Sequence, residues 1–356
     1  MPTHATSLTS TLAFGELTPD GVLDALEAVG LRGDGRLLQL NSYENRVFQV
    51  MLEDGTSVVA KFYRPGRWSD EQILEEHAFA LELQAAEVPV MAPRKLSLSA
   101  WTLRPGHSAQ LAGPDSTLLH WSDGSHRHRV SISPYLGGRD PRVETDADWR
   151  RLGRLIGRVH AVGRQGTFSH RIPMTPALAD AAVDLLLDLD VVEVSLRSRW
   201  EALAREAVCG IERAFAQVSD LKTLRLHGDA HRGNLLERDD ALTLVDLDDA
   251  CTGPAVQDLW LFLDGQDPRS GQRQLDLLLS GYEDFAPFDD EERVLIEPLR
   301  TLRMLRHSAW IAQRWEDPSF ARAFPSFGSP SHWADQITAL QEQVERMGGV
   351  RPSTGG

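Results

Sequence analysis

Two short segments beyond the middle of the chain carry the residue types of a phosphoryl-transfer site. Residues 227–236 read His-Gly-Asp-Ala-His-Arg-Gly-Asn-Leu-Leu, and residues 244–249 read Leu-Val-Asp-Leu-Asp-Asp. Asp229 and Asn234 have the five-residue spacing of the proton-accepting Asp and the metal-binding Asn in a kinase catalytic loop. Asp246 follows Asn234 by twelve residues. The pattern predicts Asp229 and Asp246 as catalytic residues, with Asn234 and Asp246 holding Mg²⁺ on the phosphates of ATP.

A lysine on an early strand is the candidate contact for the nucleotide phosphates. Lys61 lies in residues 57–63, Ser-Val-Val-Ala-Lys-Phe-Tyr, which read as a strand. A lone strand lysine is more often solvated, but its place upstream of a helix and a catalytic loop favours phosphate binding. In such an arrangement a Glu of the next helix steadies the lysine. Glu75 and Glu76 are both candidates, and Glu76 is preferred because Leu83 is taken as the packed end of that helix.

A polar turn occupies the place where a glycine-rich loop would cover the phosphates. Residues 41–45 read Asn-Ser-Tyr-Glu-Asn and contain no glycine. Ser42 and the neighbouring backbone amides can nevertheless bond phosphate oxygens. An ordinary hairpin turn is an equally weighted alternative.

Other polar residues around the two segments are assigned supporting roles. His227 is expected to brace the loop through hydrogen bonds, and His231 to orient Asp229 or a water. Asp248 either assists the metal site or caps a turn. Asp258 opens a predicted helix and is expected to be a structural buttress for the catalytic loop.

Two further clusters have less certain roles. His120, His126 and His128 fall in a stretch rich in Gly, Ser and Asp, where a solvated hairpin is favoured over a metal site because no carboxylate or cysteine completes the ligand set. Three arginines follow one helix face near the end of the chain, and they either line a substrate cleft or pair with acidic neighbours. They are Arg300, Arg303 and Arg306.

The elements that must position these residues follow from hydrophobic periodicity and turn residues. Helices are predicted at residues 19–29, 70–87, 146–163, 176–193, 196–217, 255–264, 271–285, 290–316 and 331–347. Strands are predicted at residues 37–40, 46–52, 57–63, 94–103, 117–122 and 129–133, with short catalytic strands within 223–248. This order predicts an α+β protein with two lobes: residues 1–133 form a small sheet lobe with one main helix, and residues 134–347 a larger, mostly helical lobe. Residues 348–356 are predicted to be a flexible tail.

Composition excludes several classes of protein. The chain has 356 residues, of which 42% are hydrophobic, and its formal net charge of −15 argues against bulk binding to nucleic acid or anionic lipid. Two cysteines cannot form a disulfide framework or a cysteine-based zinc site. The sequence lacks an 18-residue apolar run and a signal peptide, so we expect a cytoplasmic protein with no membrane span. We also expect the protein to act as a monomer.

Several segments resemble one bacterial kinase family. The narrowest are residues 40–48, Leu-Asn-Ser-Tyr-Glu-Asn-Arg-Val-Phe, and 59–68, Val-Ala-Lys-Phe-Tyr-Arg-Pro-Gly-Arg-Trp. Residues 72–77, 225–229, 245–250, 253–260 and 296–300 add to them. The chain resembles the stress response kinase A family, the RdoA-type Ser/Thr protein kinases, within the aminoglycoside phosphotransferase and choline kinase superfamily. His-Gly-Asp alone indicates only the superfamily.

The resemblance implies a bilobal protein-kinase-like fold that uses ATP and Mg²⁺ and transfers phosphate to Ser or Thr hydroxyls of protein substrates, its own included. It gives Asp229 the role of proton acceptor, and Asn234 and Asp246 the role of Mg²⁺ ligands. Ser42 and Lys61 are then ATP contacts. The adenine would meet the hinge backbone at residues 133–135, which include Pro134 and Tyr135. Residues 104–128 depart from the resemblance, being longer and richer in His than expected.

Two other functions remain open at this point. A small-molecule kinase acting on an amino alcohol, a sugar or an antibiotic would use the same catalytic loop. An acidic helical cleft would favour such a cationic substrate, whereas an open cleft would favour a polypeptide. A non-catalytic nucleotide-sensing module is disfavoured because all four polar elements are present: Lys61, Asp229, Asn234 and Asp246.

Overall fold

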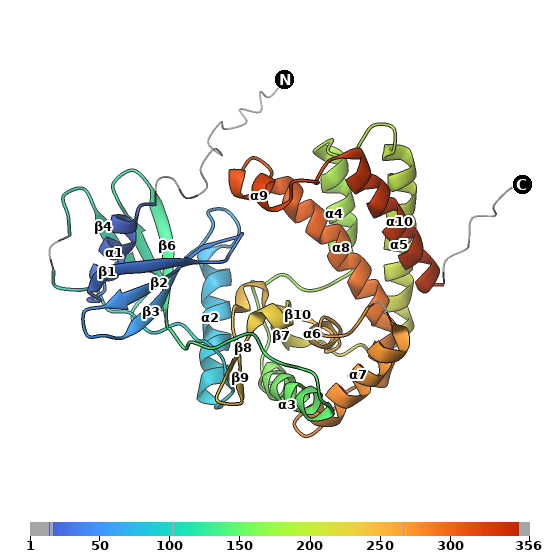
Figure 1. The fold of residues 1–356 in the computed structure, drawn as a ribbon, viewed down its shortest axis with the longest axis horizontal. Coiled ribbons are helices and arrows are strands. Elements are labelled where there is room, and N and C mark those ends of the chain that lie inside the picture. Colours follow the sequence, from blue (N-terminus) through green and yellow to red (C-terminus); the bar gives the residue numbers. More distant parts are fainter. Residues whose placement is uncertain (1–13, 15–16, 102, 266, 349–356) are drawn as a thin grey trace, which may run out of the picture.

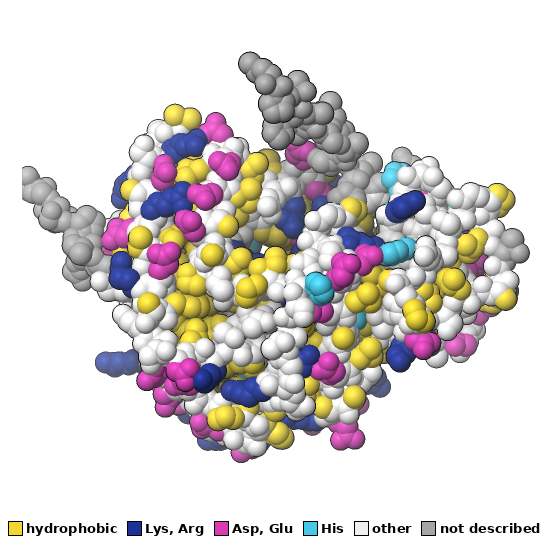
Figure 2. Space-filling view, turned by 180° about the vertical axis from the view of Figure 1, so that it is seen from behind, with side chains coloured by type: hydrophobic (Ala, Val, Ile, Leu, Met, Phe, Trp, Pro, Cys, Tyr) yellow, Lys and Arg dark blue, Asp and Glu magenta, His cyan; other side chains and the backbone are white. Residues whose placement is uncertain are grey.

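The computed structural model describes residues 14, 17–101, 103–265 and 267–348, and it shows a sheet-based lobe beside a larger helical lobe (Figure 1). The predicted α+β class is confirmed. Residues 349–356 of the predicted tail lie outside the described residues. None of the described helices has the length and apolar character that a membrane crossing needs. Acidic and basic side chains are interspersed over the face seen in Figure 2.

The smaller lobe is built on a six-stranded antiparallel sheet in the order β1-β2-β3-β6-β5-β4. Its strands are β1 (Gly33–Leu40), β2 (Arg46–Leu52), β3 (Ser57–Phe62), β4 (Ser108–Leu111), β5 (Leu119–Ser122) and β6 (Arg127–Pro134). Helix α1 (Pro19–Glu27) starts at the side-chain cap of Thr18 and packs Val22 and Leu26 into the same core as Phe48 and Ile132. Burial of alternate strand residues under a helix is what stabilises such a sheet.

Helix α2 (Asp70–Ala85) joins the two lobes (Figure 1). A capping box between Ser69 and Gln72 fixes its start. Ile73 packs with Tyr63 in the smaller lobe, whereas Phe79 belongs to a core cluster of the larger lobe. The two ends of one rigid helix are therefore buried in different lobes.

Three predicted elements differ from the structure. Residues 94–101 form no strand, because the amides of Arg94 and Leu96 bond to separate acceptors, the carbonyls of Ile132 and Ser116, and not to one neighbouring ladder. The strand lies instead at β4. The helix predicted at 255–264 is only the four-residue α6 (Gln257–Trp260), and the one predicted at 290–316 is divided into a 3-10 turn (Asp290–Leu295) and α8 (Ile296–Gln313). A separate helix, α9 (Pro318–Ala323), then begins at the Asp317 cap.

The larger lobe has two helical cores. Helices α4 (Ala177–Asp188), α5 (Arg197–Gln217), α8 and α10 (Pro330–Arg346) surround the buried edge-to-face pair Trp200 and Trp333. Helices α3 (Asp146–Gly163) and α7 (Pro268–Tyr282) pack so closely that a Cβ on Gly153 would lie 1.9 Å from the carbonyl oxygen of Leu278. Glycine is thus required where these two backbones meet.

Two small antiparallel ladders in the larger lobe position the two polar segments, residues 227–234 and 245–250. β7 (Leu224–Leu226) pairs with β10 (Cys251–Gly253), and β8 (Leu235–Arg238) pairs with β9 (Ala241–Leu244). The segment 227–234 leaves β7 and enters β8, while the segment 245–250 leaves β9 and enters β10. The ladders therefore bring both polar segments to the same region of the lobe.

Candidate active site

The loop after β7 is held by a buried hydrogen-bond system. Asp258 accepts from the amides of His227 (2.7 Å) and Gly228 (2.8 Å), and it also contacts Nε2 of His160 at 3.1 Å. The buttress predicted for Asp258 is present. Gly228 has φ +84°, and a Cβ there would lie 2.1 Å from the carbonyl oxygen of Asp249, so only glycine fits between the two segments.

His227 braces the loop as predicted. Its ring Nε2 lies 2.9 Å from the carbonyl oxygen of Val245, and its Nδ1 accepts the amide of Asp229 at 3.3 Å. The side chain is fully buried. It therefore ties the loop after β7 to the segment that carries Asp246.

Asp229 extends from this loop with both carboxylate oxygens in polar contact. Arg303 of α8 donates to Oδ1 at 2.8 Å, and Nε2 of His231 lies 3.3 Å from Oδ2. Burial alone would raise the pKa of Asp229, but the His231 contact and the Arg303 charge outweigh it and hold the pKa well below its ordinary value. Asp229 is thus an ionised acceptor near neutral pH. His231 has the orienting position predicted for it.

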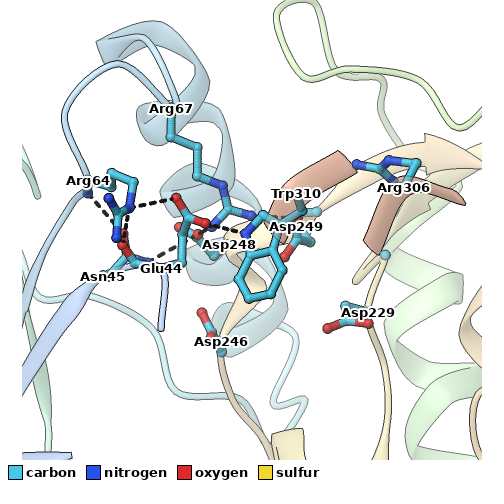
Figure 3. Close-up of polar contacts among 12 residues, drawn as sticks. Glu44, Asn45, Arg64, Arg67, Asp229, Asp246, Asp248, Asp249, Arg306 and Trp310 are labelled. Carbon is cyan, nitrogen blue, oxygen red and sulfur yellow. Dashed lines mark hydrogen bonds and ion pairs between the residues drawn. The ribbon is translucent and has the colours of Figure 1, made fainter. Parts of the chain in front are cut away.

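Asn234 and Asp246 are brought together by the β8–β9 hairpin. Leu235 pairs with Leu244, and the amide of Val245 donates to the carbonyl of Asn234 at 3.0 Å, so the two candidate ligands flank the same end of the ladder. The side-chain amide of Asn234 donates to the carbonyl of Asp229 (3.0 Å), which leaves its oxygen as the ligand atom. Asp246 has φ +60° and a 49% exposed side chain, and in Figure 3 it lies across from Asp229.

This donor set fits a hard divalent cation. It offers one carboxylate and one amide oxygen, and no group of three His, Cys, Asp or Glu side chains with metal-binding placement occurs in the described part of the chain. Mg²⁺ typically takes one or two protein carboxylates and completes its shell with phosphate oxygens and water. Asn234 and Asp246 would hold such an ion against a nucleotide.

Lys61 pairs with carboxylates of the larger lobe. Its ammonium lies 3.0 Å from Oδ1 of Asp246 and 3.0 Å from Oδ1 of Asp248. Burial would lower the pKa of Lys61, but these two carboxylates hold it well above its ordinary value, so the lysine stays charged. The charged group predicted to face the phosphates therefore lies beside the predicted metal ligand.

The predicted Glu partner of Lys61 needs correction. Among the described residues, Lys61 forms its ion pairs with Asp246 and Asp248 and not with Glu76. Glu76 is buried near Lys61. Burial raises the pKa of Glu76, and this effect is larger than that of the positive charge of Lys61, which lowers the pKa. Glu75 points elsewhere, since its carboxylate accepts the amides of residues 169–171. Glu76 remains the better of the two candidates, but the direct partners come from the segment after β9.

Asp248 of the larger lobe contacts charged and polar side chains of the smaller lobe, so its role is not limited to capping a turn. Only 2% of the residue is exposed, and its carboxylate contacts Lys61, Arg67 and the side-chain amide of Asn45, the last at 3.2 Å. Burial would raise the pKa of Asp248, yet the charges of Arg67 and Lys61 hold it well below its ordinary value. Figure 3 shows Arg67 extending from the smaller lobe towards Asp248 and Asp249.

The turn at residues 41–45 is attached to α8 and the start of α9 by buried ion pairs. Ser42 Oγ accepts the amide of Asn45 at 3.2 Å, which leaves the hydroxyl proton available to donate. Four charged side chains, each at most 12% exposed, connect the lobes at this point, and we call them the interlobe latch: Glu44, Arg64, Arg314 and Asp317. The contacts are Glu44 with Arg314 (2.6 Å), Glu44 with Arg64 (3.2 Å) and Arg64 with Asp317 (2.8 Å).

The predicted hinge follows the end of β6. Pro134 pairs with Val58 in the sheet, and the amide of Tyr135 donates to the carbonyl of Ser57 at 3.2 Å. An adenine contact through that amide would compete with this bond. The assignment of residues 133–135 to adenine binding stays a prediction, as does the lobe boundary at residue 134.

The histidine-rich stretch forms hairpins, but it is not uniformly solvated. His128 is 4% exposed and stacks on Trp121 with ring centroids 5.6 Å apart. His120 instead contacts Asp70 (2.8 Å), and His126 contacts Asp123 (3.5 Å). The prediction of a solvated hairpin was wrong for His128, because that position faces the sheet core.

Some residues of the site carry no local signal in the sequence. Glu44 and Arg67 lie in segments that support the family resemblance, yet nothing around them indicates which carboxylates or arginines they contact. Arg303 was one of three arginines left between a cleft and an ion-pair role. The structure separates them: Arg303 reaches Asp229, whereas Arg300 pairs with Glu297 at 3.3 Å.

The chain is similar in sequence to a known protein family and to characterised kinases. The sequence model of the phosphotransferase enzyme family matches residues 36–295. Stress response kinase A of Escherichia coli (strain K12) is 38% identical over 339 residues, covering 94% of this chain and 95% of that protein. The serine/threonine protein kinase RdoA of Salmonella typhimurium (strain LT2) is 38% identical over 335 residues, covering 93% and 94%.

Solved structures share the fold at lower sequence identity. An amicoumacin kinase in complex with AMP-PNP, Ca²⁺ and Ami superposes with a TM-score of 0.67 at 17% identity, covering 94% of this chain and 95% of that one. A microcompartment-associated aminopropanol kinase gives a TM-score of 0.66 at 18% identity, covering 93% and 99%. These similarities establish the bilobal kinase-like fold.

Proposed function

The chain belongs to the phosphotransferase enzyme family, and we propose that it is an ATP- and Mg²⁺-dependent serine/threonine protein kinase of the stress response type. The observation that carries the phosphotransferase part of the proposal is that contacts between the two lobes and within the loops bring Asp229, Asn234, Asp246 and Lys61 together. A polypeptide acceptor is supported by the full-length similarity to stress response kinase A and the RdoA kinase. The small-molecule kinases share the fold at less than half that identity.

The chemistry follows from the charges at the site. Lys61 would neutralise nucleotide phosphates, and the Ser42 hydroxyl and nearby amides would bond their oxygens. Mg²⁺ bound by Asn234 and Asp246 would neutralise charge on the phosphates. In a loose transition state the attacking hydroxyl needs orientation more than early deprotonation. Asp229 suits this role, because a carboxylate with a lowered pKa is a weak base but a permanent hydrogen-bond acceptor.

The same carboxylate then takes the proton as the new P–O bond forms. The buried Asp258 system fixes the loop that carries Asp229, so the acceptor oxygen is ionised and oriented before substrate arrives. Such positioning of the reacting groups supplies much of the rate enhancement in phosphoryl transfer.

Incubation of the full-length protein with γ-labelled ATP and Mg²⁺ tests the proposed substrate class. Two sets of acceptors are compared: the protein itself with an unfolded casein-like protein, and a panel of amino alcohols, sugars and aminoglycosides. We expect acid-stable label on Ser or Thr of protein. Label confined to small molecules would overturn the protein-kinase assignment while leaving the family membership in place.

A further inference from the structure

One face of α8, continued by its C-cap residue Arg314, runs from Asp229 to the turn at residues 41–45. The stripe is formed by residues three or four positions apart: Arg303, His307, Trp310 and Arg314. At one end Arg303 donates to Asp229, and at the other Arg314 and the Trp310 indole donate to Glu44. Both ends of this face therefore touch residues of the candidate site.

Arg306 lies on the same face, one turn beyond Arg303. Its polar contact is a weak one to Sδ of Met174 at 4.0 Å, and no carboxylate of the described residues lies within ion-pair distance of it. Figure 3 draws Arg306 and Asp229 on the same side of the view, away from Asp246. Arg306 is therefore a half-buried positive charge next to the catalytic loop with most of its donors unused.

Arg303 also has N–H donors that are not engaged by Asp229. It reaches Asp229 through Nη2, and its side chain is 43% exposed. A guanidinium has five N–H donors in a planar fork, so one bond to Asp229 leaves others for a second anion. The charge of Arg303 is balanced by Asp229, whereas that of Arg306 is not balanced by a neighbouring carboxylate.

Arg306 is thus a cation without an ion-pair partner among the described residues, in a chain whose net charge is −15. A cationic acceptor would be repelled by Arg306. A carboxylate, in contrast, matches the guanidinium fork and forms charge-assisted, often bidentate, hydrogen bonds. Side chains one helical turn apart lie about 5–6 Å from each other, so an anion that reaches Arg306 is close to the base as well.

We propose that Arg303 and Arg306 recognise an anionic group on the acceptor, and that the enzyme selects serine or threonine residues flanked by a carboxylate side chain. This inference rests on the proposed function, since it requires a polypeptide acceptor. The competing possibility is a contact between the same arginines and the phosphate being transferred. That alternative predicts a changed KM for ATP, whereas acceptor recognition predicts a changed preference among peptides.

The test uses the full-length enzyme and three peptides that carry a single serine flanked by Glu, Gln or Lys. The measured quantity is the ratio of kcat/KM between peptides, taken within each preparation so that any loss of folded protein cancels. We expect the wild type to prefer the Glu peptide over the Gln peptide by about tenfold, the effect of one charge-assisted hydrogen bond. Arg306→Gln should bring this ratio close to one, and Arg306→Glu should reverse the order of the Glu and Lys peptides.

A matched control comes from Arg273, an exposed arginine that pairs with Asp146 on α3. Arg273→Gln should keep the wild-type ratio. Equal use of the three peptides by the wild type, or an unchanged ratio in Arg306→Glu, would overturn the inference while the protein-kinase assignment stands. A raised KM for ATP in Arg306→Gln with an intact peptide ratio would also overturn it. If only small molecules were labelled, the proposed function would fail and this inference with it.

Discussion

Replacement of Glu44 by alanine tests whether the interlobe latch stabilises the protein. The Glu44 carboxylate pairs with Arg314 at 2.6 Å and Arg64 at 3.2 Å, and these three side chains are 9%, 12% and 8% exposed. Removing one partner of a buried ion pair typically costs about 3–5 kcal/mol because the other charge is left buried. In the variant, Arg64 would still pair with Asp317, which lies 2.8 Å away. We therefore expect the free energy of unfolding to fall by an amount at the lower end of that range, about 3 kcal/mol.

The assay is urea denaturation followed by circular dichroism, with the free energy of unfolding compared between variants. Glu53→Ala is a matched control, because Glu53 lies in the β2–β3 turn and forms an exposed pair with Arg32 at 3.8 Å. Exposed pairs contribute roughly 0–1 kcal/mol. Because Glu44 lies in the turn at residues 41–45, which we propose contacts the nucleotide phosphates, Glu44→Ala should also raise the KM for ATP, whereas Glu53→Ala should not. A loss in Glu44→Ala no larger than in the control would refute the reasoning.

Three further predictions concern Asp246, Gly228 and Glu292, the last a buried residue of the 3-10 turn before α8 whose carboxylate accepts the amide of Val256. Asp246→Ala should weaken nucleotide binding in the presence of Mg²⁺ far more than in its absence, as measured by calorimetric titration under both conditions; equal weakening would argue against a metal role. Gly228→Ala should lower kcat at least tenfold, because its Cβ would lie 2.1 Å from the carbonyl oxygen of Asp249, and wild-type turnover would contradict the close packing. Burial raises the pKa of Glu292 to about 7, so its ionisation destabilises the fold as pH rises from about 4.5 to 7. Glu292→Gln should therefore gain stability over the wild type, on the order of 2–3 kcal/mol, between pH 5 and pH 8, and a pH-independent difference in unfolding free energy would exclude this.

Local sequence signals were sufficient for much of the fold and for the catalytic loop. The bounds of α3, Asp146–Gly163, agree with the predicted helix because apolar periodicity and terminal residues lie within the element itself. The hairpin between Asn234 and Asp246 is equally local, since its register is fixed by a short turn. Asp258 could be assigned as a buttress from its place at the start of a helix.

Partners that come from distant segments could not be predicted in this way. Glu44 and Arg314 are 270 positions apart, and Lys61 and Asp246 are 185 apart, so the packing of the lobes decides which charges meet. For this reason the sequence did not indicate that the direct ion-pair partners of Lys61 are Asp246 and Asp248. The strand predicted at 94–103 failed because periodicity cannot show that its amides bond to separate segments.

The central claim is that Asp229 accepts the proton of a protein hydroxyl. Its most direct test compares the wild type with Asp229→Asn, which keeps the shape of the side chain and removes its charge. Transfer from γ-labelled ATP to protein and the affinity for ATP with Mg²⁺ are measured on the same preparations. We predict that transfer falls by at least a hundredfold, the scale of general-base catalysis, while the affinity for ATP changes less than threefold. Transfer at the wild-type rate by Asp229→Asn would contradict the claim.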